Sequence, residues 1–164
     1  MAPTTTLPSR SEPVRVGDTA PDFTLLDQNT EEWTLSEALA KGPVVLCFFP
    51  MAFTGVCAEE MGCVSRDLAK WSGAGREVVG VSCDSFATLK AWADQSGFKH
   101  RLLADMHRAV CRAYGLYWAD LNIAQRGTVV VERGLDGTPT VSWVQAREPG
   151  QAMDFDKVLE AIAS

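Results

Sequence analysis

Cys57 is the residue whose position offers the clearest chemistry. It follows an apolar run over residues 43–49 and stands in the first turn of a predicted helix. Unpaired backbone N–H groups and the positive end of the helix dipole favour a thiolate there, and the thiolate is the nucleophilic form of cysteine. Thr54, three residues earlier, can accept a hydrogen bond from a peroxide O–H or donate one to the thiolate. The segment therefore predicts a nucleophilic thiol with a hydroxyl beside it.

A thiolate that attacks a peroxide needs a rigid loop and a cation. Pro50 ends the apolar run and fixes its own φ, so the loop is stiff and shields the sulfur on one side. A cation would stabilise both the thiolate and the leaving oxygen. Arg126, just before a predicted strand, is the candidate, with a surface arginine as the alternative. Glu60, one helical turn after Cys57, either orients Arg126 or is an ordinary first-turn glutamate favoured by the dipole.

The elements that hold these residues follow from hydrophobic periodicity. The run 43–49 is continuous and rich in β-branched and aromatic residues, which is typical of a central strand buried on both faces. Ser85 or Asp84 caps a later helix that Gly97 ends. In chain order we expect strands at 22–26, 32–35, 43–49, 77–82, 101–104 (an edge element), 127–131 and 140–144, and helices at 36–42, 57–71, 85–97, 106–114 and 155–162.

This order predicts an α/β fold. An N-terminal β-hairpin precedes a β-α-β-α half and a β-β-α half, with right-handed crossovers between parallel strands. Helices would then cover both faces of one central mixed sheet, as in thioredoxin-like folds. The length fits one domain over residues 15–164. Residues 1–14, rich in Thr, Pro and Ser, are expected to form a disordered N-terminal arm.

Composition narrows the classes of partner. The net charge is −6 and no Lys/Arg block is present, which argues against nucleic acid or an anionic membrane surface. The longest apolar run, 43–53, is too short to span a bilayer. No export signal is visible, so we expect a cytoplasmic protein with reduced thiols. His100 and His107 are poorly spaced as ligands, and no nucleotide-binding motif is present, so neither metal nor cofactor is expected.

Four other cysteines and two apolar residues complete the candidate site. Cys47, inside a central strand, and Cys111, in a short helix, are expected to be core residues. Cys63, which lies off the apolar stripe of its helix, and Cys83, at the end of a strand, are possible resolving cysteines. The apolar residues Met51 and Phe53 of the loop are candidates for a collar that contacts organic hydroperoxides.

The segment 48–57 resembles the active-site segment of the peroxiredoxins, whose pattern is Pro-x-x-x-Thr/Ser-x-x-Cys. Further matches lie in the segments 20–25, 95–98, 113–115 and 126–128. The sequence is most similar to the short, one-cysteine alkyl hydroperoxide reductase E branch. The resemblance implies a homodimer that reduces hydrogen peroxide and organic hydroperoxides through a sulfenic acid on Cys57. It also implies that Arg126 completes the site and that a low-molecular-weight thiol or a small redoxin recycles the enzyme.

The sequence departs from the two-cysteine patterns of that family. One branch places its resolving cysteine five positions after the first, but here residue 62 is Gly and the cysteine is Cys63. A helical rise of ~9 Å over six residues exceeds the ~7 Å that a disulfide allows, so a bond from Cys57 to Cys63 would require unwinding. A two-cysteine peroxiredoxin using Cys63 or Cys83 and a redox sensor stay open as alternatives. A thiol-disulfide oxidoreductase is disfavoured, because Thr54 replaces the first cysteine of CxxC.

Overall fold

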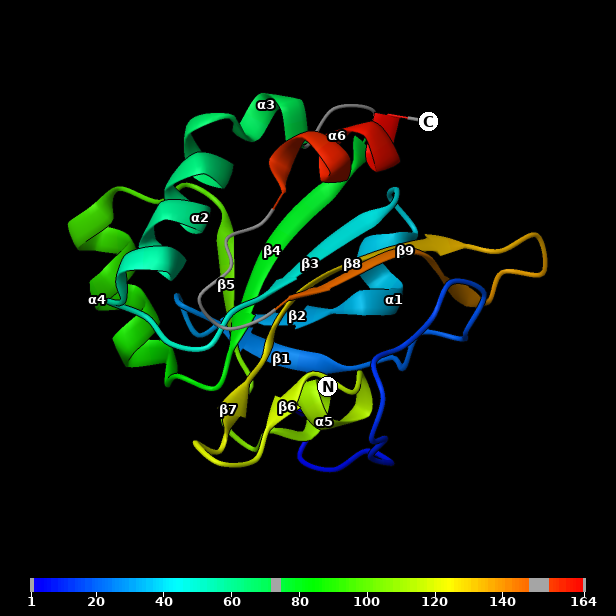
Figure 1. Cartoon of the computed structure of the whole chain (residues 1–164), viewed down its shortest axis with the longest axis horizontal. Helices are drawn as coiled ribbons and strands as arrows, with labels where there is room; N and C mark the ends of the chain where they lie inside the picture. Colours follow the sequence, from blue (N-terminus) through cyan, green and yellow to red (C-terminus); the bar gives the residue numbers. More distant parts are fainter. Residues whose placement is uncertain (1, 72–74, 148–153, 164) are drawn as a thin grey trace.

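The computed structural model describes residues 2–71, 75–147 and 154–163 of the chain and centres on a seven-stranded mixed sheet (Figure 1). In spatial order the strands are β2 (Glu32–Thr34), β1 (Thr24–Asp27), β5 (Arg101–Ala104), β4 (Glu77–Ser82), β3 (Val44–Phe48), β8 (Arg126–Arg133) and β9 (Pro139–Arg147). Strands β5, β4 and β3 run parallel, whereas the other neighbours pair antiparallel. The predicted N-terminal hairpin is β1–β2.

Helices cover both faces of this sheet because its central strand is apolar on both sides. In β3, Leu46 and Phe48 point into one hydrophobic cluster, whereas Val45 and Cys47 point into the other. The first cluster includes residues of α1 (Leu35–Leu39) and α5 (Ala109–Ala113). The second includes residues of α2 (Gly55–Arg66), α3 (Leu68–Trp71), α4 (Phe86–Ser96) and α6 (Phe155–Ala163). The predicted α/β architecture is therefore confirmed.

Two helix boundaries show how local chemistry sets the elements. The hydroxyl of Ser85 accepts a hydrogen bond from the Thr88 N–H at 3.1 Å, so Ser85 rather than Asp84 caps α4. Gly97 ends α4 with a φ of 70°, which glycine adopts without steric cost. The predicted helix over 57–71 is divided, because Asp67 leaves helical geometry between α2 and α3.

Two sheet features differ from the sequence expectations. The strand at 101–104 was expected at an edge, but β5 lies between β1 and β4. The N-terminal hairpin joins the sheet because β1 pairs with β5. A strand of four residues is too short for its sequence to show whether it has a neighbour on both sides. A separate two-stranded sheet, β6 (Tyr117–Trp118) with β7 (Ile123–Ala124), was not predicted, because two-residue strands are too short to show a period.

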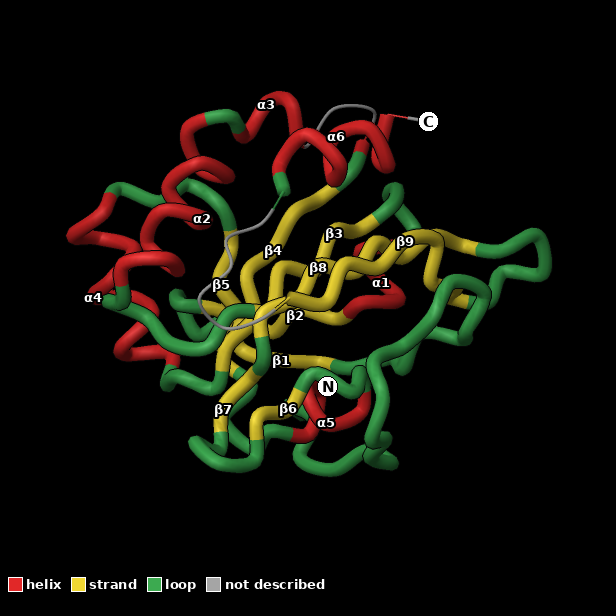
Figure 2. Tube along the Cα trace, viewed as in Figure 1, coloured by secondary structure: helices red, strands yellow, loops and turns green. Residues whose placement is uncertain are grey.

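The N-terminal segment, which the sequence predicts to be a disordered arm, lies against the domain in this structure. In residues 2–14 the structure describes neither helix nor strand, and Figure 2 shows the segment as a loop beside α5. The amides of Thr4, Arg10 and Val14 donate to carbonyls of the domain at 2.7 to 3.1 Å. Val14 is buried in the cluster under α5. Among the described residues, no helix combines the length and apolar character needed to cross a bilayer.

Candidate active site

The loop between β3 and α2 carries the predicted site and is held at both ends. The amide of Phe49 donates to the carbonyl of Val81 at 3.0 Å, which extends the pairing with β4 past the end of β3. Pro50 follows, buried, and turns the chain. The amide of Ala52 then donates to the Asp84 carboxylate at 2.9 Å, and the Ser82 hydroxyl donates to the same oxygen at 2.7 Å. The loop is therefore fixed to the C-terminal end of β4.

Cys57 is the third residue of α2, whose N-cap is Thr54. It has 0% exposure and packs in the same cluster as Met61 and Val64, which lie on the same face of the helix. Its place in the first turn puts the sulfur near the unpaired N–H groups that carry the positive end of the dipole. The predicted position of the thiol at the start of a helix is confirmed.

Arg126 lies against this sulfur. The pairing of Phe48 with Gly127 places Arg126 one residue beyond the end of β3, beside the loop. Its Nη2 donates to the Cys57 Sγ at 3.1 Å, and its Nη1 forms an ion pair with Glu60. Arg126 is 2% exposed and Glu60 is 1% exposed. The alternatives of a surface arginine and of an ordinary first-turn glutamate are therefore wrong.

The electrostatics of this trio explain the buried carboxylate. A buried guanidinium is costly without a partner, and Glu60 supplies one. Because the carboxylate engages Nη1, the second nitrogen stays directed at the sulfur of Cys57. A guanidinium donates in a fixed planar fork, so Glu60 and Cys57 are bound by different arms of the same group. Because Glu60 holds the guanidinium in place, Arg126 offers a positive charge and an N–H donor to a thiolate from a fixed position.

Thr54 is exposed, and its hydroxyl donates to the Met51 carbonyl at 2.7 Å. A hydroxyl has two lone pairs in addition to its proton. The oxygen of Thr54 therefore still can accept a hydrogen bond from a thiol or a peroxide. The structure thus brings together Pro50, Thr54, Cys57 and Arg126, the four residues predicted to be catalytic, with Glu60 behind them.

A cavity of about 270 Å³ opens beside these residues. Pro50, Thr54 and Arg126 line one part of it, whereas Cys57, which Arg126 contacts, is fully buried and is not a lining residue. The remainder is lined by apolar or small residues, namely Met51, Gly55, Val56, Trp118, Leu121 and Ile123. Because the β6–β7 hairpin supplies three of them, this unpredicted hairpin forms a wall of the site.

The two predicted collar residues lie on different sides of the loop. Met51 is 41% exposed and lines the cavity. Phe53 has a φ of 63° and is 50% exposed, and its ring lies 6.2 Å from the ring of Trp92 in α4. A positive φ is unusual for a bulky residue. The turn that it forms directs Met51 toward the cavity and Phe53 toward α4.

The two possible resolving cysteines have different surroundings. Cys63 is partly exposed on α2, and its Sγ accepts a hydrogen bond from Arg66 at 2.9 Å. Cys83 belongs to the cluster on the opposite face of the sheet, where its Sγ lies 3.7 Å from that of Cys111. The structure therefore does not bring Cys83 to Cys57. Cys47 and Cys111 are buried, as predicted.

Asp84 and the β6–β7 hairpin are site features that sequence reasoning missed. Asp84 was weighed only as a helix cap, whereas its carboxylate holds the Ala52 amide 32 positions earlier in the chain. A Ser-Cys-Asp sequence at the end of a parallel strand was the available signal, since such strand ends meet at one edge of a sheet. Nothing in the sequence pointed to Trp118, Leu121 or Ile123 as lining residues.

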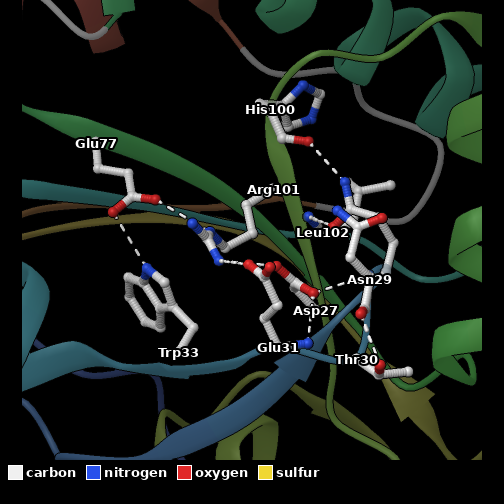
Figure 3. Close-up of polar contacts among 10 residues, drawn as sticks. Asp27, Asn29, Thr30, Glu31, Trp33, Glu77, His100, Arg101 and Leu102 are labelled. Carbon is white, nitrogen blue, oxygen red and sulfur yellow. Dashed lines mark hydrogen bonds and ion pairs between the residues drawn. The ribbon is translucent and has the colours of Figure 1, made fainter.

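The opposite end of the sheet holds a second polar cluster, shown in Figure 3. Arg101, the first residue of β5, contacts Asp27 at 2.7 Å, Glu77 at 3.4 Å and Glu31 at 3.7 Å. These residues line a cavity of about 300 Å³. His100, adjacent in sequence, is 3% exposed, and burial lowers its pKa to about 4. Its Nε2 lies 3.2 Å from the Met61 sulfur of α2.

The fold and the site together define a class. A thioredoxin-like sheet that presents a cysteine at a helix start, in contact with a buried arginine and beside a small cavity, is equipped for reduction of a peroxide by a thiol. The chemistry requires a nucleophilic sulfur and a cation for the leaving oxygen, and both are present within 3.1 Å of each other.

Comparison with known proteins agrees with this class. The family described as AhpC/TSA matches residues 16–135. Alkyl hydroperoxide reductase E of Mycobacterium tuberculosis is 37% identical over 153 residues, which cover 92% of this chain and 97% of the relative. The solved structure of peroxidoxin BcpB from Mycobacterium tuberculosis superposes with a TM-score of 0.80 at 29% identity, over 90% of this chain and 96% of that one. The AhpC structure from the same organism shares the fold with a TM-score of 0.81 at 23% identity.

The chain belongs to the AhpC/TSA family and is a peroxiredoxin of the alkyl hydroperoxide reductase E type. It is accordingly a thiol-dependent peroxidase. The predicted family, enzyme class and thioredoxin-like fold are confirmed.

Proposed function

We propose that Cys57 is the peroxidatic residue and that it reduces hydrogen peroxide and organic hydroperoxides. The observation that carries this is the 3.1 Å contact between its Sγ and Nη2 of the buried Arg126. The Cys57 thiolate attacks the terminal peroxide oxygen, the O–O bond breaks, and the leaving alkoxide or hydroxide takes a proton. Cys57 then carries a sulfenic acid.

Each neighbour has a distinct part in this step. Arg126 stabilises the thiolate before attack and the negative charge on the leaving oxygen during it. Thr54 accepts the peroxide O–H at its free lone pairs, which orients the terminal oxygen toward sulfur. Pro50 closes one side of the loop, and Glu60 keeps the guanidinium in place. These roles need no metal and no organic cofactor.

The cavity beside the loop supports organic hydroperoxides as substrates. The side chains of Met51, Trp118, Leu121 and Ile123 offer an apolar surface next to the polar atoms of Thr54 and Arg126. An alkyl group would lie on the apolar part while the O–O group reaches the polar part. Met51 and Phe53 are still proposed as a collar, with Met51 as the residue that lines the cavity.

An external thiol is proposed to recycle the sulfenic acid. Cys83 lies on the other face of the sheet, and Cys63 is six residues further along α2, where only unwinding would let it reach Cys57. A low-molecular-weight thiol or a small redoxin would therefore attack the sulfenic sulfur and a second thiol would release the enzyme. The homodimer and the cytoplasmic location stay predictions.

Stopped-flow fluorescence followed by intact mass tests the proposal. Reduced wild-type protein and Cys57→Ser are each mixed with hydrogen peroxide. A fast signal that the variant lacks, with a gain of one oxygen (about 16 Da) on the wild type after a single equivalent of peroxide, is the expected result. Cys47→Ser is the matched control, because it removes a different buried thiol from the same cluster. Equal kinetics in wild type and Cys57→Ser would contradict the assignment.

The same experiment separates the alternatives. A loss of about 2 Da that requires Cys63 would indicate a two-cysteine enzyme whose helix unwinds. A single oxidation with no turnover in the presence of any thiol or redoxin would indicate a redox sensor. Steady consumption of peroxide with an added thiol, without an internal disulfide to Cys57, supports the one-cysteine cycle.

A further inference from the structure

Two thiols lie in contact far from the peroxidatic residue. Cys83 directly follows β4 and Cys111 lies in α5, and their sulfur atoms are 3.7 Å apart. One thiol donates to the other. Cys83 is 7% exposed and Cys111 is 0% exposed. Both belong to the hydrophobic cluster under α1 and α5, whereas Cys57 belongs to the cluster under α2.

The surroundings hold both thiols in place. The Asp105 carboxylate accepts the amides of Val110 and Cys111, at 3.2 Å and 2.8 Å, and so fixes the start of α5. The Cys111 thiol also lies 3.4 Å from the carbonyl of Arg108. The contact between the two sulfurs therefore joins the end of a central strand to an anchored helix.

We propose that Cys83 and Cys111 form a second redox centre, which closes to a disulfide when the protein is exposed to hydroperoxide. The inference goes beyond the proposed function, because neither thiol acts on Cys57. Cys83, the more exposed of the two, attacks the peroxide, the O–O bond breaks, and Cys83 becomes a sulfenic acid while an alcohol or water leaves. The Cys111 sulfur then displaces hydroxide from Cys83, and its proton completes a water molecule. Two thiols lose two electrons and one hydroperoxide gains them.

The geometry suits this order of events. A disulfide needs its sulfurs about 2.05 Å apart, and the two sulfurs, already in contact at 3.7 Å, have only a short distance to close. The hydrogen bond to Cys83 and burial both raise the pKa of Cys111, so Cys111 stays a thiol until its partner is oxidised. Asp105 adds to that effect, because a nearby carboxylate disfavours a second negative charge.

The location gives the disulfide a route to the active site. Cys83 stands between Ser82 and Asp84. The Asp84 carboxylate accepts the Ala52 amide of the peroxidatic loop, and the Ser82 hydroxyl donates to that carboxylate. Movement of the Cys83 backbone on oxidation would therefore be felt at the loop that carries Thr54. Oxidation of the Cys83–Cys111 pair by peroxide would therefore affect a position next to the peroxidatic loop, although the pair lies on the other face of the sheet.

The test uses Cys57→Ser, which leaves four cysteines and is independent of peroxidatic chemistry. The variant is treated with excess hydrogen peroxide or, separately, with diamide, then denatured and alkylated. We expect two of the four thiols to escape alkylation, an intact mass lower by about 2 Da before alkylation, and a reducible link between the tryptic peptides 77–90 and 109–112. Diamide makes failure of peroxide access distinguishable from failure of the pair to bond.

Two matched variants locate the bond. Adding Cys111→Ala to Cys57→Ser should abolish the link and leave an oxygen on Cys83. Adding Cys47→Ala, which removes a buried cysteine of the other cluster, should leave the link intact. If Cys111→Ala does not fold, the peptide map of Cys57→Ser alone decides.

Three results would overturn the proposal. The first is alkylation of all four thiols after hydrogen peroxide; the diamide sample then shows whether peroxide fails to reach the pair or the pair cannot bond. The second is a link that joins Cys63 instead. The third is a stoichiometric zinc ion that protects both thiols, since the two sulfurs and an Asp105 oxygen lie within 4.8 Å of one another and such donors also suit zinc.

Discussion

Two arginines, each the first residue of a strand, lie at opposite ends of the sheet in different environments. Arg126 of β8 is buried and donates to one carboxylate and to the sulfur of Cys57. Arg101 of β5 is one-third exposed and contacts three carboxylates, as Figure 3 shows. The residue type and its position in the strand are the same, but the partners differ.

The difference indicates what makes an arginine chemically useful. The three acidic partners of Arg101 exceed its charge, so it holds strands together and offers little to a further anion. Arg126 engages Glu60 with its Nη1 and directs its Nη2 at a nucleophile. Burial raises the strength of that interaction, because the local dielectric is low. The site therefore depends on a buried guanidinium that a carboxylate holds by one arm and that presents the other arm to a sulfur.

The largest effect is expected from replacing the two arginines in the same way. Arg126→Lys keeps the charge but loses the fork that engages Glu60 and Cys57 together. The rate constant of Cys57 oxidation should fall about 100- to 1000-fold, the range for losing a donor to a developing anion. Arg101→Lys should change it less than about twofold. Competition kinetics with hydrogen peroxide measure both, and similar losses in the two variants would contradict the comparison.

The next-largest effect concerns His100, which lies beside the Arg101 cluster and contacts the helix that carries Cys57. It directly precedes Arg101 of β5, and its side chain contacts Met61, one turn after Cys57 in α2. Its pKa falls from 6.5 to about 4 in the folded protein, so the unfolded chain binds the proton first as pH drops. The contribution of neutral His100 to the free energy of unfolding is fully present above pH 6.5. It is lost as the pH falls toward 4, which lowers that free energy by roughly 3 kcal/mol.

His100→Phe should remove that pH dependence, since a phenyl ring keeps the contact with Phe98 and does not titrate. His107→Asn is the matched control, because His107 is exposed and is the second of the two histidines in the chain. Urea unfolding from pH 7 to pH 4 measures both. A wild-type slope that persists in His100→Phe would assign the titration to another group.

The active-site loop could be read from the sequence because its chemistry is local. Pro50, Thr54 and Cys57 lie within eight residues, and the strand and helix around them have strong periodicity. Arg126 was less certain, since its proximity depends on how β8 pairs with β3, and the resemblance to a known family supplied that information. The ion pair with Glu60 was weighed against a plain helix-dipole role, which the structure excludes.

What the sequence did not show depends on register between distant strands. The carboxylate of Asp84 reaches Ala52 because Phe48 pairs with Val81 in parallel strands. The contact of Cys83 with Cys111 depends on where α5 crosses the sheet. The hydrophobic periodicity of one segment shows neither the register between two strands nor the position of a helix on the sheet. The sequence analysis therefore assigned Asp84 to helix capping and Cys83 to a possible resolving role beside Cys57.

A smaller effect is expected from the carboxylate that holds the loop. Asp84→Ala removes the acceptor of the Ala52 amide and of the Ser82 hydroxyl. Because the loop then loses its fixed position relative to Cys57, oxidation should slow about tenfold. Asp22→Ala is the matched control: its carboxylate accepts the Ser36 amide at 2.9 Å at the start of α1. Equal rates in Asp84→Ala and wild type would show that the loop holds its position without this bond.

The smallest effect is expected in the cluster around Arg101. Replacing its acidic partners one at a time tests whether Arg101 can lose one carboxylate without a loss of stability. Glu31 is 70% exposed and 3.7 Å from Arg101, so Glu31→Ala should cost less than about 0.5 kcal/mol of unfolding free energy. Asp27 is 2% exposed and accepts two backbone amides in addition to Arg101, so Asp27→Ala should cost about 2 kcal/mol. Urea unfolding at neutral pH measures both. If Glu31→Ala costs as much as Asp27→Ala, the exposed carboxylate is as necessary as the buried one, and Arg101 would not have the surplus of acidic partners on which its contrast with Arg126 rests.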